Sequence, residues 1–483
     1  MKTTHGPFYG RQPELERLSE LWEKETSSLV TCRGRRRVGK STLVEEFAAR
    51  TANRFFRFEG LPPRPGMDDR KQREAFCADL AAQSHLPKVV VETWSEAFAL
   101  LDGALPDKGR TVVLLDEISW LGGYDPDFAG YLKKAWDRMF SRRKGLVFVL
   151  CGSVSAWIVE NILKNTGFAG RNSLDLEVPE LPLRDCDRFF GKRASRIAVA
   201  EKLDILSVTG GVPRYLQEIR PALSANENVR RLCFTPEGLL FREFDEIFSD
   251  VFGEKSARRR IVLEGLARGS RTVSELAAEL GEAANGHLSA TLEELRLAGF
   301  AAKDSGLNPQ TGLPLREARW RLKDNYARFY LRYVRPRKAA IEAGLFPFGA
   351  LERLDGWDAI LGLQFENLVL DRVPALLPKI GLRDTLVFSA APYRQERTNR
   401  AKGCQIDLLV QSKRSVCVVE IKRRREIGRG IADEVAEKVS RLRLDKGLSV
   451  RTALVYAGDL SPAVREEGFF DFVVGADELF ADA

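Results

Sequence analysis

The feature that most constrains this chain is the segment GRRRVGKST at residues 34–42, which matches the pattern GxxxxGK[ST]. Apolar residues 28–32 precede it and apolar residues at helical spacing follow it, which predicts a strand, a tight loop and a helix. The loop amides, with no Cβ at Gly34 and Gly39, can turn toward phosphate oxygens, and the helix N-terminus adds partial positive charge. The segment therefore predicts a site for nucleotide phosphates.

The residues of this loop have distinct predicted roles. Lys40 is expected to reach the β- and γ-phosphates, and the hydroxyl of Ser41 is expected to bind magnesium. An ordinary strand–turn–helix is the alternative. The residues expected to hold ATP through this loop are Gly34, Arg37, Val38, Gly39, Lys40, Ser41 and Thr42.

A second segment, TVVLLDE at residues 111–117, completes the predicted site. Its apolar residues predict a buried strand, at whose carboxyl end Asp116 would bind magnesium through water. Glu117 is placed to polarise the attacking water. A strand that ends in a solvated acidic pair is the alternative for this segment.

Composition excludes several classes of protein. The 483 residues include three histidines, so zinc sites and histidine-dependent triads are not expected. Seven cysteines without a CxxC pair indicate free thiols in a reducing compartment. No leader-like N-terminus and no apolar run of about 20 residues is found, so we expect a cytoplasmic protein without a membrane span. The net charge of +8 permits nucleic-acid contact without requiring it.

The pattern of the chain predicts an α/β multidomain protein. Strands alternate with helices up to about residue 160, which implies a parallel P-loop sheet. A mostly helical stretch follows, then three helices with a hairpin-like segment, which is the order of a winged helix. A second α/β unit ends the chain. The predicted domains are 1–182 for the ATPase core, 183–254 for a helical lid, 255–338 for the winged helix and 339–483 for the C-terminal domain.

Several motifs occur in one order: FYGR at residues 8–11, GRRRVGKST, LLDEISW, CGS and GGVPRYL. Together they resemble the archaeal-type ATPase family of the AAA+/STAND group, over roughly residues 7–335. The resemblance implies that Ser153 is the polar sensor, that Arg171 acts as an arginine finger and that Arg214 is the sensor of the lid. It also places Gly10 and Arg11 near the adenine. A turn cap for Ser153 and surface ion pairs for the two later arginines are the alternatives.

Charged residues interrupt two apolar segments near the C-terminus, at Asp407 and at Glu420 and Lys422. Charges in buried strands are costly unless they pair or coordinate a ligand. Strand alternation places Glu420 and Lys422 on one face. Two carboxylates and an amine can hold magnesium and orient a water for attack on a phosphodiester.

This arrangement resembles the PD-(D/E)xK nuclease fold, which implies a restriction-endonuclease-like C-terminal domain. The resemblance adds Glu366, on the preceding helix, to Asp407 and Glu420 as a metal ligand. Ile406 replaces the proline of the motif, which leaves the ligand itself intact, and no downstream glutamine matches. The implied metal is Mg²⁺, with Mn²⁺ as a substitute. A degenerate domain that does not cut is the alternative.

Basic residues flank this predicted site and favour nucleic acid, DNA in particular, as the partner; a solvated basic face is the alternative. They are Arg394, Arg397, Arg400, Lys402, Arg423, Arg424 and Arg425. In the predicted winged helix, Glu293 and Glu294 on the third helix would repel phosphates, so we expect this unit to transmit conformational state. DNA contact through its wing is the second choice, with Arg316, Arg319 and Arg321.

The leading hypothesis is an ATP-binding and hydrolysing protein that controls a magnesium-dependent DNA nuclease. The rival is a signal-transducing ATPase switch whose C-terminal domain binds DNA or a protein partner without cutting. A third hypothesis, a mechanical homo-oligomeric ring, depends on Arg171 reaching a neighbouring subunit.

Overall fold

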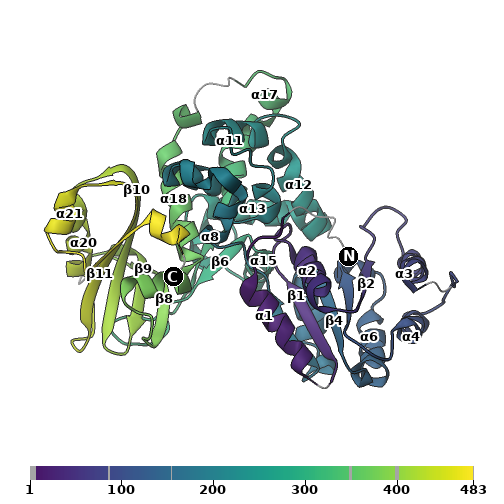
Figure 1. Cartoon of the computed structure of the whole chain (residues 1–483). Coiled ribbons are helices and arrows are strands. Elements are labelled where there is room, and N and C mark those ends of the chain that lie inside the picture. Colours follow the sequence, from purple (N-terminus) through teal and green to yellow (C-terminus); the bar gives the residue numbers. More distant parts are fainter. Residues whose placement is uncertain are drawn as a thin grey trace. The chain divides into compact units, whose positions relative to one another are not determined.

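The computed structural model describes residues 7–24, 26–84, 87–153, 155–346, 351–397 and 402–481 (Figure 1). The chain divides into two compact units. The first comprises Met1–Leu181, Glu246–Ser256 and Leu297–Gly299, and the second comprises Pro182–Asp245, Ala257–Arg296 and Phe300–Ala483.

A five-stranded sheet forms the centre of the first unit, with strand order β2-β3-β4-β1-β5. Every neighbouring pair in it is parallel. Because parallel strands end at the same edge, the segments after β1, β3 and β4 lie together at its carboxyl edge. The strands are β1 (Ser28–Arg33), β2 (Arg54–Glu59), β3 (Thr111–Asp116), β4 (Leu146–Gly152) and β5 (Asn172–Glu177).

Two apolar cores cover the two faces of this sheet. Val112 and Leu114 of β3 pack with α1 and α2, whereas Val113 and Leu115 pack with α3, α4 and α6. Both faces are buried, which explains why β3 and β4 are continuous apolar runs rather than alternating ones. The helices are α1 (Gln12–Glu20), α2 (Lys40–Thr51), α3 (Asp69–Ser84), α4 (Trp94–Ala104), α5 (Ile118–Leu121), α6 (Phe128–Arg138) and α7 (Ser155–Ile158).

The middle of the chain is mainly helical. Its helices are α8 (Leu183–Cys186), α9 (Val199–Thr209), α10 (Pro213–Leu216), α11 (Ala225–Cys233) and α12 (Leu239–Phe252). Three further helices, α13 (Ser256–Ala267), α14 (Val273–Leu280) and α15 (Gly286–Leu297), precede the antiparallel strands β6 (Ala301–Asp304) and β7 (Arg319–Leu322). Three helices and a hairpin follow one another as the sequence predicts, and the winged-helix assignment itself stays a prediction.

A capping box starts α14. The hydroxyl of Thr272 accepts a hydrogen bond from the amide of Glu275, whose carboxylate in turn accepts one from the amide of Thr272. This pair satisfies two amides that have no partner inside the helix. The start of α14 is therefore fixed by its own local sequence.

The C-terminal part of the second unit contains a mixed five-stranded sheet of order β12-β11-β10-β9-β8. β9 is antiparallel to both β8 and β10, whereas β10, β11 and β12 run parallel to one another. The two apolar segments that carry Asp407 and Glu420 therefore form adjacent strands. The strands are β8 (Val387–Gln395), β9 (Cys404–Ser412), β10 (Ser415–Ile427), β11 (Ser449–Leu460) and β12 (Phe472–Gly475).

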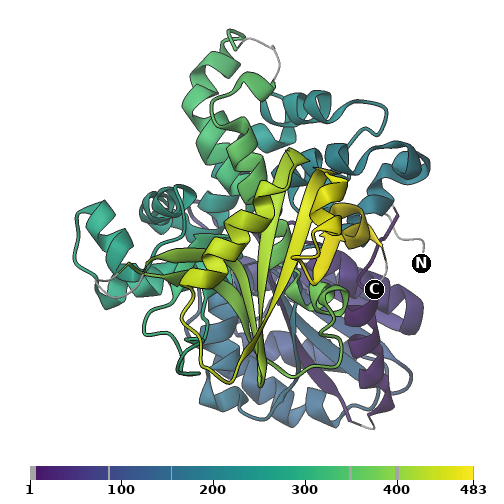
Figure 2. The same ribbon diagram turned by 90° about the vertical axis from the view of Figure 1, so that its left-hand side faces the viewer.

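Two helices cover the faces of this sheet. Ile431 and Val435 of α20 pack against Val416 and Val418 of β10, and α18 contacts β10 from the other side (Figures 1 and 2). The remaining helices are α16 (Asn325–Phe329), α17 (Lys338–Glu342), α18 (Trp357–Leu370), α19 (Val373–Leu376), α20 (Gly430–Arg441) and α21 (Pro462–Glu466).

All seven cysteines are buried and free, as the sequence predicts. Across the described ranges, no helix combines the length and the apolar character that crossing a membrane requires.

Candidate functional site

The loop between β1 and α2 bends through backbone conformations that favour glycine. The φ angles of Gly34, Arg37 and Gly39 are 147°, 72° and 85°. A Cβ at Gly34 would lie 2.4 Å from the carbonyl oxygen of Val178, so a larger residue does not fit there. The Gly34 amide donates a hydrogen bond to Ser155 Oγ at 3.2 Å. The close approach of Val178 and the hydrogen bond to Ser155 therefore hold the start of the loop in place.

Lys40 begins α2 and is buried. Its Nζ donates hydrogen bonds to the carbonyl oxygens of Gly34 at 3.0 Å and Arg35 at 3.1 Å. The ammonium therefore lies inside the loop that the sequence predicts for phosphates. Ser41 and Thr42 follow, half-buried, in the first turn of α2, where an anion experiences the positive end of the helix dipole.

Two arginines, Arg11 before the loop and Arg36 within it, connect the loop to its surroundings. Arg11 is buried and donates to the carbonyl oxygen of Val38 at 2.9 Å. Arg36 forms an ion pair with Asp250 at 2.7 Å, near the C-terminal end of α12. No motif predicts the second contact, because no sequence pattern relates two residues that lie so far apart along the chain.

Asp116 ends β3 at the same edge of the sheet and is buried. Arg57 of β2 donates to its Oδ2 at 3.1 Å and also contacts Glu45 and Glu59. Burial opposes the positive charge of Arg57, but Asp116 and then the two glutamates outweigh it and raise the pKa of the guanidinium. Arg57 is therefore a site residue that the motifs do not reveal.

Glu117 and Ser153 are brought together by the neighbouring strands β3 and β4. The hydroxyl of Ser153 donates to Glu117 Oε2 at 2.8 Å, and its amide donates to the same oxygen at 3.2 Å. The backbone of Glu117 has a φ of 47°, which is uncommon for a residue with a Cβ. The arrangement holds one carboxylate oxygen in a defined position at the carboxyl edge of the sheet.

The two other arginines of the predicted site have partners within the chain. Arg171 pairs with Asp137 of α6. Arg214 pairs with Glu218, one turn further along, at 2.5 Å. Arg214 belongs to the second unit, whereas the phosphate loop belongs to the first. The finger and lid-sensor roles of these residues stay predictions.

In the C-terminal domain, Asp407 and Glu420 lie on the adjacent strands β9 and β10, and both are buried. Asp407 Oδ2 accepts a hydrogen bond from the amide of Ile421 at 2.8 Å. Lys422 Nζ lies 2.6 Å from Glu420 Oε1. The predicted carboxylates and amine are therefore neighbours.

A second lysine, which no motif in the sequence indicates, also binds Glu420. Lys438 of α20 donates to its two carboxylate oxygens at 2.8 and 2.6 Å. Burial would lower the pKa of Lys422, but the charge of Glu420 outweighs it and the pKa is raised. Glu420 is thus a fully buried carboxylate held between two ammonium groups.

Glu366 of α18 belongs to the same group of charges. Burial and then the negative charge of Asp407 raise the pKa of Glu366 to about 7, although Arg321, Arg328 and Lys422 oppose the shift. The pKa of Asp407 is also raised, by burial first and by Glu420 second. Carboxylates that raise one another's pKa in this way are costly to bury without a compensating cation.

The carboxylate oxygens of Glu366, Asp407 and Glu420 are the donors that a hard cation such as Mg²⁺ prefers, so the chemistry of this set fits the predicted metal. The three side chains supply the oxygen donors of a metal site, but they do not lie close enough together to complete it. In the described part of the chain, no group of three or more His, Cys, Asp or Glu side chains is close enough to hold a metal ion. In this structure, Lys422 and Lys438 supply the positive charge at Glu420.

The basic residues predicted to flank this site differ in whether they are exposed and in whether they pair with an acidic residue. Arg397, Lys402 and Arg425 are exposed. Arg394 pairs with Glu396 at 3.1 Å, and Arg424 with Glu434 at 3.5 Å. The prediction for Arg423 is wrong, because it is held by Asp204 and Ser207 of α9. Arg400 lies outside the described residues.

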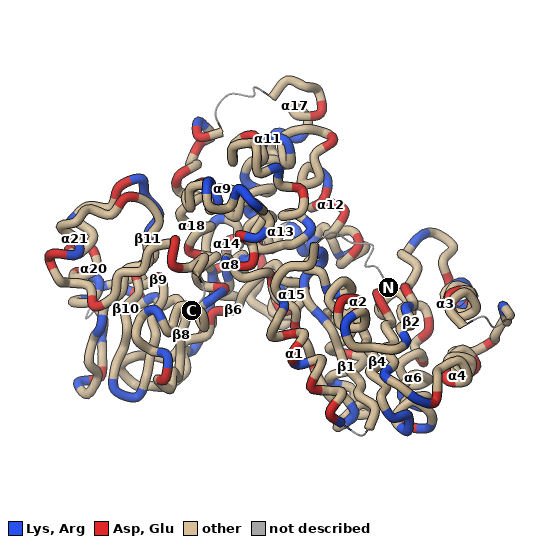
Figure 3. Tube along the Cα trace, in the orientation of Figure 1, with Lys and Arg blue, Asp and Glu red and all other residues tan. Residues whose placement is uncertain are grey.

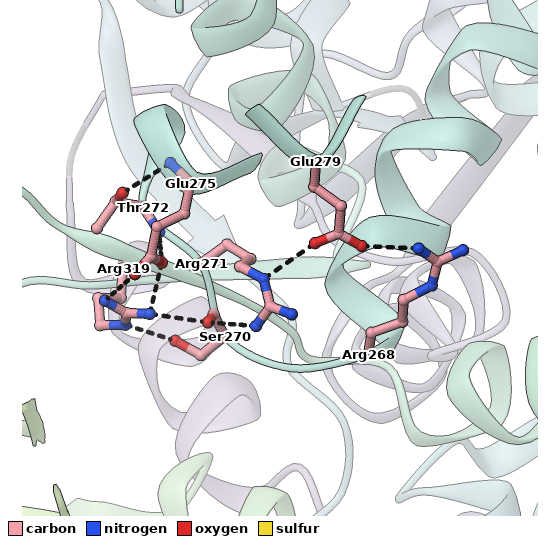
Figure 4. A network of polar contacts seen from close by, with 7 residues as sticks. All are labelled: Arg268, Ser270, Arg271, Thr272, Glu275, Glu279 and Arg319. Atoms are coloured by element: carbon pink, nitrogen blue, oxygen red, sulfur yellow. Dashed lines mark hydrogen bonds and ion pairs between the residues drawn. The ribbon is translucent and has the colours of Figure 1, made fainter. Parts of the chain in front are cut away.

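The prediction of a basic wing is also wrong for two of its three arginines. Arg319 binds Glu275 of α14 and the carbonyl oxygen of Ser270 (Figure 4). Arg321 is buried and binds Asp304 and Asp371. Both guanidiniums are neutralised within the unit, which leaves Arg316 exposed on the hairpin.

Known proteins resemble this chain over parts of its length. Residues 8–219 match a family described as an ATPase domain predominantly from Archaea. An uncharacterised protein of Methanocaldococcus jannaschii is 23% identical over 387 residues, which cover 77% of this chain and 81% of that protein.

Two solved structures are similar at low identity. A Walker-type ATPase of Pyrococcus abyssi has a TM-score of 0.49 and 18% identity, covering 67% of this chain and 96% of its own. The ORC2 protein of Aeropyrum pernix, in its ADPNP–ADP complexes, has a TM-score of 0.43 and 14% identity, covering 72% and 98%.

The parallel sheet, the glycine-rich loop with Lys40 and the paired Asp116 and Glu117 define a P-loop ATPase. More particularly, residues 8–219 are similar to an ATPase domain described as predominantly archaeal.

Proposed function

We propose that this ATPase controls metal-dependent cleavage of DNA by the C-terminal domain. The observation that carries the proposal is a group of charges in which Asp407 and Glu420 are buried and Glu366 and Lys422 are half-buried. Packing alone does not favour carboxylates whose charges act on one another, because each one raises the cost of ionising the next. A metal-dependent site that cleaves phosphodiesters would account for this group of charges.

Different residues of the C-terminal domain would bind the metal ion, orient the attacking water and bind the phosphates. Glu366, Asp407 and Glu420 would hold Mg²⁺ or Mn²⁺, and the chemistry that the ion supplies is stabilisation of negative charge on the phosphodiester under attack. Lys422 would orient the attacking water. The exposed Arg397, Lys402 and Arg425 would bind neighbouring phosphates.

In the ATPase unit, the loop amides and Lys40 would bind the β- and γ-phosphates, while Ser41 and Asp116 would hold magnesium. Glu117, held by Ser153, would polarise the attacking water. ATP binding would then change the contacts of the loop. Arg36 would pass on such a change, since it pairs with Asp250 of α12.

Within the second unit, buried contacts tie the hairpin to the helix that carries Glu366. Arg321 of β7 binds Asp371 just after α18, and Arg328 of α16 donates to Gln364 within it at 2.6 Å. A shift of the hairpin would therefore move α18. This supports a role of the three-helix and hairpin segment in transmitting the state of the ATPase.

Cleavage of supercoiled and linear single-stranded DNA, with Mg²⁺ or Mn²⁺ and with or without ATP, tests the proposal. We expect wild type to cut, Asp407→Asn and Glu420→Ala to lose cutting, and Lys40→Ala to lose only the response to ATP. Asp433→Asn is the matched control, because this exposed carboxylate of α20 lies outside the charge group and should cut as wild type does. Undiminished cutting by Asp407→Asn would contradict the proposal.

One observation favours a second candidate, an ATPase switch whose C-terminal domain binds DNA or a protein without cutting. Lys422 and Lys438 already neutralise Glu420, so a metal is not needed for its burial. Calorimetry separates the candidates. A nuclease should bind Mg²⁺, and more tightly when Lys438→Met removes a competing cation; a switch should bind none at these carboxylates in either form.

A further inference from the structure

A large basic hollow lies at the amino edge of the parallel sheet in the first unit. Its volume is about 1070 Å³, and it is lined by the segments that precede β2, β3 and β4 together with the end of α6. Because all five strands are parallel, this edge is opposite the one that carries Lys40 and Asp116. The hollow is therefore separate from the ATP site.

Cations dominate this hollow. Two acidic side chains, Asp102 and Asp107, line it beside six cations, so the lining carries a net charge of +4. Figure 3 shows Lys and Arg gathered below the labels of β4 and α6. The six cations are Lys108, Arg110, Arg138, Arg142, Arg143 and Lys144.

The two acids offset only part of this charge. Arg143 pairs with both of them, with Asp102 at 2.6 Å and with Asp107 at 3.7 Å. The other five cations are exposed. Arg110 is ordered by the ring of Trp22, which lies 5.5 Å from its guanidinium. Like charges at one place repel one another, so their accumulation is favourable when an anion binds there.

We propose that this hollow binds the phosphodiester backbone of a nucleic acid. Several exposed cations from separate loops suit an extended polyanion, because each neutralises one phosphate and releases its counterion. A compact phosphate would need buried, prearranged donors such as those of the loop at Lys40. Four of the six cations are arginines, whose planar fork matches two phosphate oxygens.

The choice of nucleic acid over an acidic protein segment rests on the proposed function, which already gives the C-terminal domain a nucleic-acid substrate. The hollow then adds a second contact with the same polymer, on the ATPase unit. Binding at the hollow requires no cutting, so the two proposals can be tested apart.

Fluorescence anisotropy with a labelled 30-nucleotide strand and the matching duplex, in EDTA so that no metal supports cleavage, tests the inference. The variant Lys108→Glu with Arg142→Glu reverses two exposed charges of the hollow. We expect it to bind about tenfold more weakly or worse at low salt. The slope of log affinity against log salt should fall by about 1.4 for the single strand, since two contacts are lost. ATP hydrolysis without DNA should stay unchanged.

The matched control is Arg70→Glu with Lys164→Glu, which makes the same charge change at exposed positions of the first unit outside the hollow. It should bind DNA with an affinity within about twofold of that of wild type, because exposed charges outside a binding site contribute little. Both pairs are also compared in an Arg397→Glu background, so that contacts near the C-terminal site do not mask the result.

Equal binding by the two charge-reversed pairs would overturn the inference. Displacement of the labelled strand by polyglutamate as readily as by unlabelled DNA would overturn it in favour of an acidic protein segment. Displacement by millimolar inorganic triphosphate alone would show a compact phosphate site instead. A protein that fails to cut DNA in the presence of Mg²⁺ would leave the anisotropy result unaffected.

Discussion

Arg171 binds Asp137 through two hydrogen bonds, from Nε to Oδ1 at 2.6 Å and from Nη2 to Oδ2 at 3.0 Å. The hydrogen bonding from Arg171 is the main reason that the pKa of Asp137 falls to about 2, with Lys133 as a weaker contributor. The residue that the family resemblance assigns as an arginine finger is therefore already engaged within its own chain. A finger role would require this pair to open.

Replacing Arg171 by methionine should raise the pKa of Asp137 toward its ordinary value. Because the folded pKa of Asp137 is depressed, its stabilising contribution is present above the unfolded pKa of about 3.9 and is lost as pH falls through about 2. Carboxyl NMR titration of aspartate-labelled protein measures the shift directly. A pKa that stays near 2 in the variant would show that Lys133 holds Asp137 without Arg171.

The hydrogen bond from Ser153 to Glu117 predicts a defect in turnover rather than in ATP binding. Ser153→Ala removes the hydroxyl contact and keeps the amide contact, so the carboxylate loses part of its orientation. We expect kcat for ATP hydrolysis to fall about tenfold, less than the roughly 10²-fold or more for loss of a general base itself, with KM nearly unchanged.

Ser153→Thr is the control for this prediction, because it restores a hydroxyl at the same position and should recover most of the rate. Glu117→Gln sets the lower limit of activity. An increase of kcat in Ser153→Ala would contradict the orienting role and would show that the hydrogen bond restrains Glu117.

Much of the ATPase fold is predictable from local patterns. The segments 28–32, 111–115 and 146–151 are apolar over a strand's length, and they form β1, β3 and β4 with boundaries within one residue. A strand that is buried on both faces needs a run of apolar residues. In a P-loop site, the glycine-rich loop follows such a strand. In these segments, the local sequence and the tertiary packing therefore favour the same strands.

Contacts between charged residues are the part that the sequence does not reveal. Arg319 and Arg321 alternate along a strand as solvent-facing residues do, yet they bind Glu275 and Asp371, which lie 44 and 50 residues away. Lys438 reaches Glu420 from a different element. A charge pattern does not distinguish solvent from a distant partner, because either one satisfies the charge.

The buried pairing of Arg321 with Asp304 and Asp371 predicts a large loss of stability when the guanidinium is removed. Arg321→Met keeps most of the apolar volume but leaves two carboxylates of low exposure without their cation. Breaking a buried pair from one side costs about 3–5 kcal/mol. In urea unfolding of the full chain, the transition that involves the second unit should move to lower denaturant concentration.

Arg316→Met is the matched control, since this arginine precedes the same strand and is exposed. A surface substitution of this kind changes stability by about 0.5 kcal/mol or less, so its transition should coincide with that of wild type. Replacing all three partners, with Asp304→Leu and Asp371→Leu added to Arg321→Met, should restore part of the loss, because no unpaired charge then remains buried. Equal midpoints for Arg321→Met and Arg316→Met would mean that the two carboxylates are hydrated without Arg321, and the link from the hairpin to α18 would then have no energetic basis.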